Sequence, residues 1–312
     1  MIQLKATRDA FGETLVELGR KNRKIVVLSG DLEDSTRAEY FKKEFPERFF
    51  NLGIAEQDIL GTAVGLSLDG LIPFACSFAV FLTNRAYDIL RISICYNRRN
   101  VKIIGSHAGI TVGPDGATAQ CLEDFAVTRV LPNIIVISPV DAIETRKATE
   151  AMADICGPVY MRLGREPFPI ITKDSDLFTV GKANTMREGK DLTIIATGLM
   201  VSESLKAADV LSEEGIEARV INIHTIKPID QESIIEAAKE TGAIVTAEEH
   251  QINGGLGSAV AEVLVKNTPA PLEMVAVNDT FGESGDPEGL LKKYHLKDVD
   301  IVDAGRKVVK RK

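Results

Sequence analysis

The sequence predicts an α/β protein made of two three-layer α/β domains with mostly parallel sheets. Apolar runs rich in β-branched residues alternate with segments of helical periodicity, and this alternation occurs twice along the 312 residues. A polar, weakly patterned stretch separates the two series. Such alternation is typical of parallel sheets whose two faces are covered by helices.

The first series predicts a domain of residues 1–170. Four continuous apolar runs are expected to be buried parallel strands: KIVVLSG (24–30), VKIIGS (101–106), NIIVISP (133–139) and PVYMRLG (158–164). The intervening segments have apolar residues at helical spacing and predict the helices Thr7–Arg20, Ala55–Leu68, Phe81–Tyr96 and Ala142–Ile155.

The second series predicts a domain of residues 190–312. Strand-like runs LTIIATG, EARVINIH, GAIVTAEEH and PLEMVAV accompany the helical segment SESLKAADVLSEEG. The polar stretch before them is rich in charged and turn-forming residues, which predicts a linker at residues 171–189.

Composition excludes several classes of function. The net charge of −8 argues against binding to nucleic acid, which requires a basic surface. The longest uncharged apolar stretch, Gly70–Asn84, is shorter than the roughly 20 residues that cross a bilayer, and it contains Pro73. The N-terminus has no basic region followed by an apolar core, so we expect a cytoplasmic protein.

Ligands of open α/β sheets gather at the carboxyl ends of the strands. Four segments are expected at such ends: SGDLEDS (29–35), NLGIAE (51–56), SFAVF (77–81) and GSHAGITVGPDGATAQ (105–120). Three of them carry polar residues that a plain turn does not need, and the other carries aromatic residues. The sequence therefore predicts a site at this edge of the first sheet.

Glu56 is the most unusual of these residues, because it begins a predicted helix in apolar surroundings. Ile54, Ile59 and Leu60 would bury it, and no basic residue lies within five positions on either side. Burial favours the protonated carboxyl, which can donate a hydrogen bond. The alternative is a glutamate that starts a helix with its carboxyl group in water, where the helix dipole favours it.

Other residues of the same loops admit two interpretations. Phe78 and Phe81 could flank a flat ring, although core packing is the simpler explanation. His107 and Asp115 lie in a long glycine-rich loop, which favours a binding site over structural roles. Arg165 follows another strand end and could bind an anion or form a surface salt bridge.

Two motifs of the second domain give weaker signals. Glu248, Glu249 and His250 are consecutive on a predicted strand, so alternate side chains point to opposite faces, which argues against a metal site. The segment NGGLGSAVAEVL (253–264) lacks the features of a phosphate-binding loop, and its glycines are better explained by close packing.

Taken together and in this order, NLGIAEQD, SFAVFLT, GSHAGITVGPDGATAQ and GPVYMRLGR resemble the C-terminal half of transketolase, a thiamine-diphosphate enzyme. The resemblance covers the whole chain. It implies that the first domain is the pyrimidine-binding domain and that the second is the transketolase C-terminal domain.

The resemblance implies a role for each matching residue. Glu56 would hydrogen-bond the aminopyrimidine ring of the cofactor and activate it, and Phe78 and Phe81 would pack on that ring. His107 would contact a hydroxyl of the donor sugar near the reacting carbon, and Asp115 would read the configuration of the sugar hydroxyls.

Further matching positions concern the phosphate group of the sugar and the cofactor. Ser35 and Arg165 match positions that bind the sugar phosphate, whereas Asp31 and Leu32 lie on the cofactor side of the same loop. The implied reaction transfers a two-carbon ketol unit from a ketose phosphate to an aldose phosphate, as in the pentose phosphate pathway.

The resemblance also implies a partner. Family members bind the cofactor diphosphate and its Mg²⁺ or Ca²⁺ through a Gly-Asp-Gly motif in another domain, and this sequence has no such motif. No metal ligand is therefore expected in this chain. We expect one subunit of a split transketolase, inactive alone, with an N-terminal partner subunit in an α2β2 assembly.

Two departures from the family pattern bear on the sugar: Pro114 stands for a common glutamate and Ala119 for a common histidine. The rival hypotheses are a β subunit of a 2-oxo-acid dehydrogenase, a deoxyxylulose-phosphate-synthase-like enzyme, and a non-catalytic assembly subunit. His107 favours transketolase among the enzymes.

Overall fold

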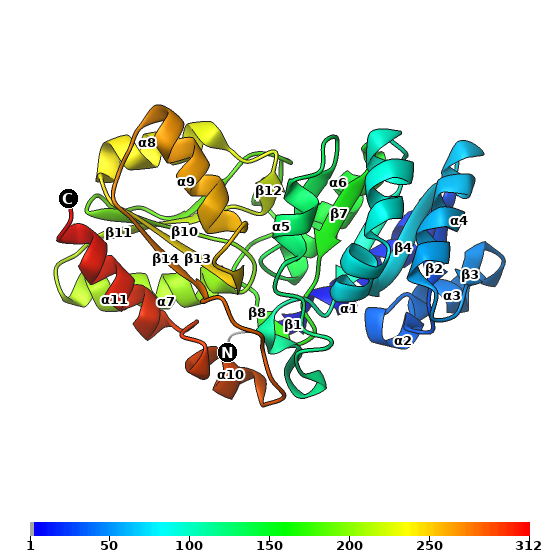
Figure 1. Cartoon of the computed structure of the whole chain (residues 1–312), viewed down its shortest axis with the longest axis horizontal. Helices are drawn as coiled ribbons and strands as arrows, with labels where there is room; N and C mark the ends of the chain where they lie inside the picture. The colour runs from blue at the N-terminus through cyan, green and yellow to red at the C-terminus, as the bar shows by residue number, and fades with distance from the viewer. Residues whose placement is uncertain (1–2) are drawn as a thin grey trace.

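The computed structural model describes residues 3–312, and these form two α/β domains lying side by side (Figure 1). The elements up to the end of the first domain are β1 (Leu4–Ala6), α1 (Thr7–Lys21), β2 (Ile25–Ser29), α2 (Glu33–Thr36), α3 (Glu39–Glu44), η1 (Pro46–Arg48), β3 (Phe49–Asn51), α4 (Glu56–Leu68), β4 (Ile72–Phe78), η2 (Phe81–Arg85), η3 (Ile89–Tyr96), β5 (Lys102–Ser106), η4 (Ile110–Asp115), α5 (Asp124–Arg129), β6 (Ile135–Ile137), α6 (Ala142–Asp154), β7 (Val159–Arg162) and β8 (Pro167–Pro169).

The remaining elements are β9 (Asn184–Arg187), β10 (Leu192–Ala196), α7 (Met200–Glu213), β11 (Ala218–Asn222), β12 (Thr225–Lys227), α8 (Gln231–Thr241), β13 (Ile244–Gln251), α9 (Leu256–Asn267), β14 (Leu272–Val277), α10 (Pro287–Lys293) and α11 (Asp298–Val309). None of the helices in residues 3–312 is both long and apolar enough to cross a bilayer.

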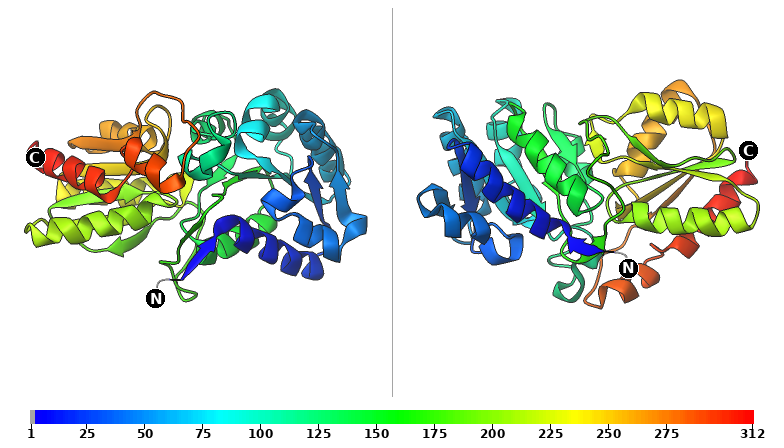
Figure 2. Two further views of the ribbon diagram at one scale, coloured as in Figure 1. Left: turned by 90° about the horizontal axis from the view of Figure 1, so that it is seen from below. Right: turned by 180° about the vertical axis from the view of Figure 1, so that it is seen from behind.

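The first sheet has the strand order β12-β6-β7-β5-β4-β2-β3, and all neighbours are parallel except β12 and β6. Its central strands β2 and β5 are buried along their whole length, as the continuous apolar runs predict. Helices α1 and α6 pack together on one face, and α4 packs with η3 on the other (Figure 2). The three-layer arrangement predicted for this part of the chain is confirmed.

The second sheet has the order β14-β13-β10-β11-β9 and is parallel except for β9. Helices α8 and α9 cover one face, and α7 and α11 cover the other (Figure 1). The prediction of two mostly parallel α/β domains is therefore confirmed. Strand β9 lies within the expected linker 171–189 and pairs with β11, while the exact domain boundaries stay a prediction.

The two domains interlock through β12, which follows the second domain's β11 but pairs with β6 of the first sheet. Lys227 at the end of β12 donates to the carbonyl oxygens of Arg129 (2.8 Å) and Leu131. The second domain thus completes one edge of the first sheet.

The prediction of one continuous α-helix over Phe81–Tyr96 is wrong. The segment forms two helical pieces of π type, η2 and η3, with a break at Ala86. The Thr83 hydroxyl donates to the carbonyl of Ala79 at 2.8 Å, and such bonds to the preceding turn bend helices. The irregular winding places Phe81 and Arg85 beside the end of β4.

Candidate active site

The carboxyl ends of β5, β4, β2 and β3 lie next to one another, because these four strands are parallel neighbours in the sheet. Asp31, Glu56, Phe78 and His107 lie at these strand ends or shortly after them. The structure thus places the four expected segments at one edge of the first sheet.

Glu56 is the first residue of α4, and its side chain is only 4% exposed. Among residues 3–312, its Oε1 atom has no hydrogen-bond partner. Its Oε2 atom lies 3.4 Å from a guanidinium nitrogen of Arg85. No basic residue is near Glu56 in the sequence, but the fold brings Arg85 of η2 close to its carboxyl group. One oxygen of that carboxyl group has no partner among the described residues.

An aromatic shelf made of Phe78, Phe81 and His107 lies at the same edge. The rings of Phe78 and Phe81 are stacked with centroids 5.6 Å apart, and Phe78 stacks on the His107 ring at 4.0 Å. Leu32 and Ala119 pack against Phe78 in the same apolar cluster. Where the family commonly has a histidine, Ala119 thus extends an apolar wall.

His107 is buried at the end of β5, and its Nδ1 lies 2.9 Å from the hydroxyl of Ser106. Burial, together with the positive charges of Arg8, Arg165 and Arg37, lowers the pKa of His107 to about 3. The imidazole is therefore neutral at physiological pH, and it can donate a hydrogen bond to a hydroxyl group or accept one from it.

Asp115 and Arg165, predicted separately, lie together. The Arg165 guanidinium donates to the carbonyl of Val112 at 2.7 Å and to the Asp115 carboxylate at 3.2 Å. Arg165 also lies 3.6 Å from Glu166. The two candidate substrate residues therefore orient each other across the end of η4.

Arg8 is a candidate binding residue that the sequence did not reveal. It donates to the backbone carbonyl of Ser35 at 2.8 Å, and its buried Nε has no hydrogen-bond partner in the described part of the chain. Burial lowers the pKa of Arg8, and the positive charges of Arg37 and Arg165 lower it further, while the carboxylates of Asp9 and Glu166 oppose this shift. Arg8 follows β1, a three-residue strand that leaves no periodic signal.

Asp31 lies at the exposed rim of this edge. Its backbone N–H donates to Asn51 Oδ1 at 3.1 Å, and its carboxylate accepts from Asn51 Nδ2 at 2.6 Å. The loops after β2 and β3 are thereby tied together. Residues 3–312 contain no group of three or more His, Cys, Asp or Glu side chains arranged to hold a metal ion.

The residues present fit the pyrimidine ring of thiamine diphosphate, the cofactor that the resemblance implies. Arg85 lies 3.4 Å from Glu56 and 4.2 Å from the centre of the Phe81 ring, so the carboxyl oxygen without a partner lies near the aromatic shelf, which suits a ring that carries a polar nitrogen. Glu56, Phe78 and Phe81 would hold that ring. The sequence expectation for these three residues stays a prediction.

The fold and the candidate site define the class: an α/β protein whose candidate small-molecule site lies at the carboxyl edge of a parallel sheet. Residues 3–169 match the family model described as transketolase, pyrimidine binding domain, and residues 181–301 match transketolase, C-terminal domain. The chain belongs to the transketolase family.

Similar proteins of nearly the same length include a putative transketolase C-terminal section of Methanocaldococcus jannaschii, 48% identical over 94% of this chain and 92% of that protein. A 6-deoxy-6-sulfo-D-fructose transketolase subunit of Clostridium sp. is 43% identical over 98% of this chain and 95% of that protein. Human transketolase is 37% identical over 97% of this chain but only 49% of its own length. The predicted resemblance to the C-terminal half of transketolase is confirmed.

Among solved structures, one described as a split gene transketolase, inactive beta4 tetramer, superposes with a TM-score of 0.92. It is 52% identical to this chain, and the match covers 98% of both chains. The likeness therefore extends over both domains and their arrangement.

Proposed function

We propose that this chain is the C-terminal subunit of a two-chain transketolase. The complex transfers a two-carbon ketol unit from a ketose phosphate to an aldose phosphate. The relatives of similar length that bear the names of transketolase sections and subunits support this proposal. The single observation that carries it is the free Oε1 of Glu56 beside the aromatic shelf.

Thiamine diphosphate, when bound, supplies the carbon nucleophile that ketol transfer requires. The contribution of this chain is to hold and orient the ring. Glu56 presents a carboxyl oxygen that can share a proton with a ring nitrogen, and Arg85 fixes the other oxygen. Phe78 and Phe81 exclude water from one side, which strengthens the hydrogen bond at Oε1.

The substrate side of the site suits a sugar with an anionic end. The three arginines Arg8, Arg37 and Arg165 gather near His107. Guanidinium groups bind phosphate oxygens in a planar fork. His107 is neutral and can contact a hydroxyl closer to the reacting carbon. One relative is named for a sulfonated fructose and another for apulose 4-phosphate, so the test includes more than one anionic sugar.

The partner in this proposal is an N-terminal subunit that carries the Gly-Asp-Gly motif and, with it, the cofactor diphosphate and a divalent metal such as Mg²⁺ or Ca²⁺. The sequence of this chain has no such motif. The solved structure described as a split gene transketolase, inactive beta4 tetramer, accords with a site that needs a second kind of subunit. We infer an α2β2 complex.

The experiment mixes this chain with such a partner and titrates thiamine diphosphate. Binding and ketose-dependent transfer are expected for the mixture and for neither chain alone. Glu56→Ala is expected to lower kcat by roughly 100-fold or more, the range lost when a proton-sharing group is removed. Phosphorylated and sulfonated ketoses serve as donors, and pyruvate with a lipoyl acceptor tests the dehydrogenase alternative.

Asp69→Asn is the matched control, because Asp69 is exposed at the opposite end of α4. It is expected to leave transfer unchanged. Full activity of the Glu56→Ala complex would show a non-catalytic subunit, and tight cofactor binding by this chain alone would contradict the shared site.

A further inference from the structure

The loop that carries His107 and Asp115 lies between the two domains. On the side of the first domain, the backbone N–H of Ala108 donates to the carbonyl of Leu163 at 3.2 Å, and that of Gly109 donates to the carbonyl of Cys121 at 2.8 Å. These bonds fix the start of the loop. From Ile110 onward, contacts from the second domain join those made by Arg165 and Gln120 of the first domain.

Glu249, near the end of β13, makes the closest of these contacts. Its Oε1 accepts a hydrogen bond of 2.6 Å from the backbone N–H of Thr111. Gly109 lies directly against the same carboxyl group: a Cβ atom there would be 2.3 Å from the Glu249 carboxyl carbon. Gly109 also has a φ of 89°, which disfavours any side chain. The loop backbone at Gly109 and Thr111 is thus in direct contact with the Glu249 carboxyl group of the second domain.

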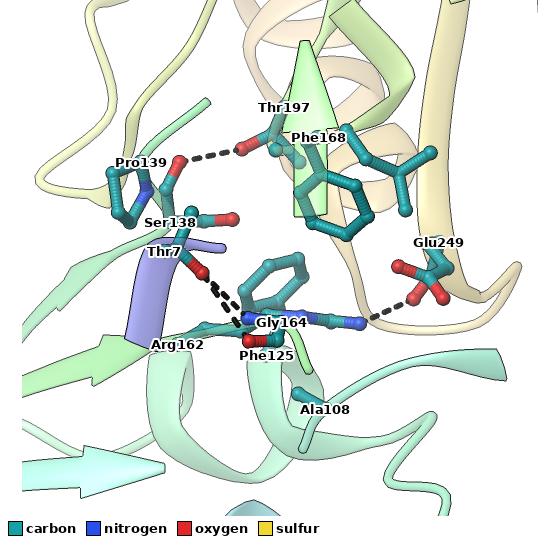
Figure 3. Close-up of a pocket in the computed structure, with 12 residues that line it drawn as sticks. Thr7, Ala108, Phe125, Ser138, Pro139, Arg162, Gly164, Phe168, Thr197 and Glu249 are labelled. Atoms are coloured by element: carbon teal, nitrogen blue, oxygen red, sulfur yellow. Dashed lines mark hydrogen bonds between the residues drawn. The ribbon is translucent and has the colours of Figure 1, made fainter. Parts of the chain in front are cut away.

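Glu249 is itself held rigidly. Arg162 donates to the backbone carbonyl of Glu249 at 2.5 Å and to the Asp124 carboxylate at 3.0 Å, and its guanidinium lies over the Phe125 ring (Figure 3). The cavity beside this group has about 20 Å³, room for roughly one water molecule, so it is a packed junction rather than a ligand site.

The neighbouring Glu248 has a different task, as expected for alternate positions on a strand. Its carboxylate accepts from the backbone N–H groups of Leu256 and Gly257 at the start of α9, at 2.7 and 2.8 Å. Glu248 therefore stabilises its own domain, whereas Glu249 reaches across to the first.

A second brace joins the far part of the loop to Glu283 and Gly285 of the second domain, partly through Gln120 of the first domain. The side-chain amide of Gln120 donates to the carbonyls of Ile110 (3.1 Å) and Glu283 (2.9 Å). The backbone N–H of Gly285 donates to the carbonyl of Gly113 at 3.4 Å. Both braces act on backbone atoms between His107 and Asp115.

We propose that Glu249 is a positioning residue: its carboxyl group, bound to the Thr111 amide, sets the place of the loop that presents His107 and Asp115 to the sugar. This inference rests on the proposed function. It gives the C-terminal domain a task in substrate binding in addition to assembly.

The test compares Glu249→Ala with Glu249→Gln. The alanine variant loses the acceptor for the Thr111 amide. The glutamine variant keeps an acceptor oxygen, and its NH2 group can donate to the Thr111 hydroxyl, which has no partner within residues 3–312. In the reconstituted complex, we expect Glu249→Ala to raise the KM for the ketose roughly 10-fold or more, as displaced binding groups do. The dissociation constant of thiamine diphosphate should stay within about twofold, and Glu249→Gln should restore most of the loss.

Hydrogen exchange of the isolated full chain gives a readout that needs no catalysis. Amides 109–116 are expected to exchange faster in Glu249→Ala and at the parent rate in Glu249→Gln. Glu144→Ala is the control for general loosening, because Glu144 is buried at the same domain junction but bonds Asn222 instead of the loop. It should leave these amides protected.

Unchanged exchange and an unchanged KM in Glu249→Ala would overturn the proposal. So would a glutamine variant as impaired as the alanine variant, or an equal effect of Glu144→Ala. If the parent complex shows no ketol transfer but Glu249→Ala still frees the loop amides, the proposed function fails while the anchoring role of Glu249 stands.

Discussion

Replacing Glu144 with glutamine is expected to stabilise the protein at alkaline pH and much less at acidic pH. Glu144 lies in the first turn of α6, buried between the domains. Its two carboxyl oxygens accept from the backbone N–H of Val140 (2.7 Å) and from Asn222 Nδ2 (2.9 Å). Burial raises the pKa of Glu144 from 4.5 to about 8. The folded chain therefore retains a proton that the unfolded chain releases.

The sign follows from proton binding. Between pH 4.5 and about 8 the folded chain binds more protons than the unfolded chain, so the free energy of unfolding falls as the pH rises through this range. At about 1.36 kcal/mol per pH unit, the upper limit of the loss is roughly 5 kcal/mol. The positive end of the α6 dipole favours the anion by about 0.5–1 kcal/mol. Subtracting this from the upper limit leaves an expected loss of about 4 kcal/mol, which glutamine abolishes because it does not ionise.

Glutamine also suits the hydrogen bonds at this position. Its carbonyl oxygen can accept from Val140, and its NH2 group can donate to Asn222 Oδ1, which is buried without a partner in the described residues. A rotation of the Asn222 amide makes this bond. The substitution thus satisfies an orphaned acceptor in addition to removing a buried charge.

The assay is chemical denaturation of parent and Glu144→Gln at a fixed protein concentration, from about pH 5 to about pH 9. The difference in unfolding free energy should grow up to about pH 8 and then stay constant. Glu150→Gln is the control, since Glu150 lies on the same helix in a partly exposed pair with Arg146 and should give a flat difference. A flat difference for Glu144→Gln as well would refute the argument.

Two further predictions concern the site. His107 should stay uncharged from about pH 5 to about pH 8, because burial lowers its pKa to about 3. In an NMR titration, the signals of its ring, assigned by comparison with His107→Gln, should not move over this range. A titration midpoint between about pH 5 and about pH 8 would contradict this prediction. Arg8→Gln should raise the KM for a ketose phosphate roughly 10- to 100-fold, the loss of one charge-assisted hydrogen bond. Arg20 is exposed on the same helix, and Arg20→Gln should leave this KM unchanged. If the two variants have the same KM, Arg8 does not contribute to substrate binding.

The sequence predicted those elements whose burial leaves a local pattern. The helix expected at Thr7–Arg20 is α1, Thr7–Lys21, and the run 24–30 contains β2. It missed β12, whose three residues pair with a strand about 90 positions earlier, since that pairing has no local signature. It expected a strand end at SFAVF (77–81), where β4 ends at Phe78, but it did not define where that strand begins.

In the candidate site, too, features with a local sequence pattern could be predicted, whereas contacts between distant positions could not. Glu56 was detectable because a carboxyl in an apolar segment conflicts with its neighbours, and such conflicts concentrate at functional positions. Its cation was not detectable, because Arg85 is 29 positions away and half exposed, like many surface arginines. Glu249 lies 138 positions from the Thr111 amide that it holds, and nothing in its strand distinguishes it from Glu248.

A locally unmatched carboxyl can be neutralised by the fold or kept available for a ligand, and the sequence alone does not separate the two outcomes. Here the fold divides the group: Arg85 approaches one oxygen of Glu56, and the other faces no donor among the described residues. Full neutralisation would have required a donor at both oxygens, since an unpartnered buried oxygen is costly. A ligand that donates a hydrogen bond would remove this cost, which makes Oε1, rather than the carboxylate as a whole, the atom that we expect to contact the ligand.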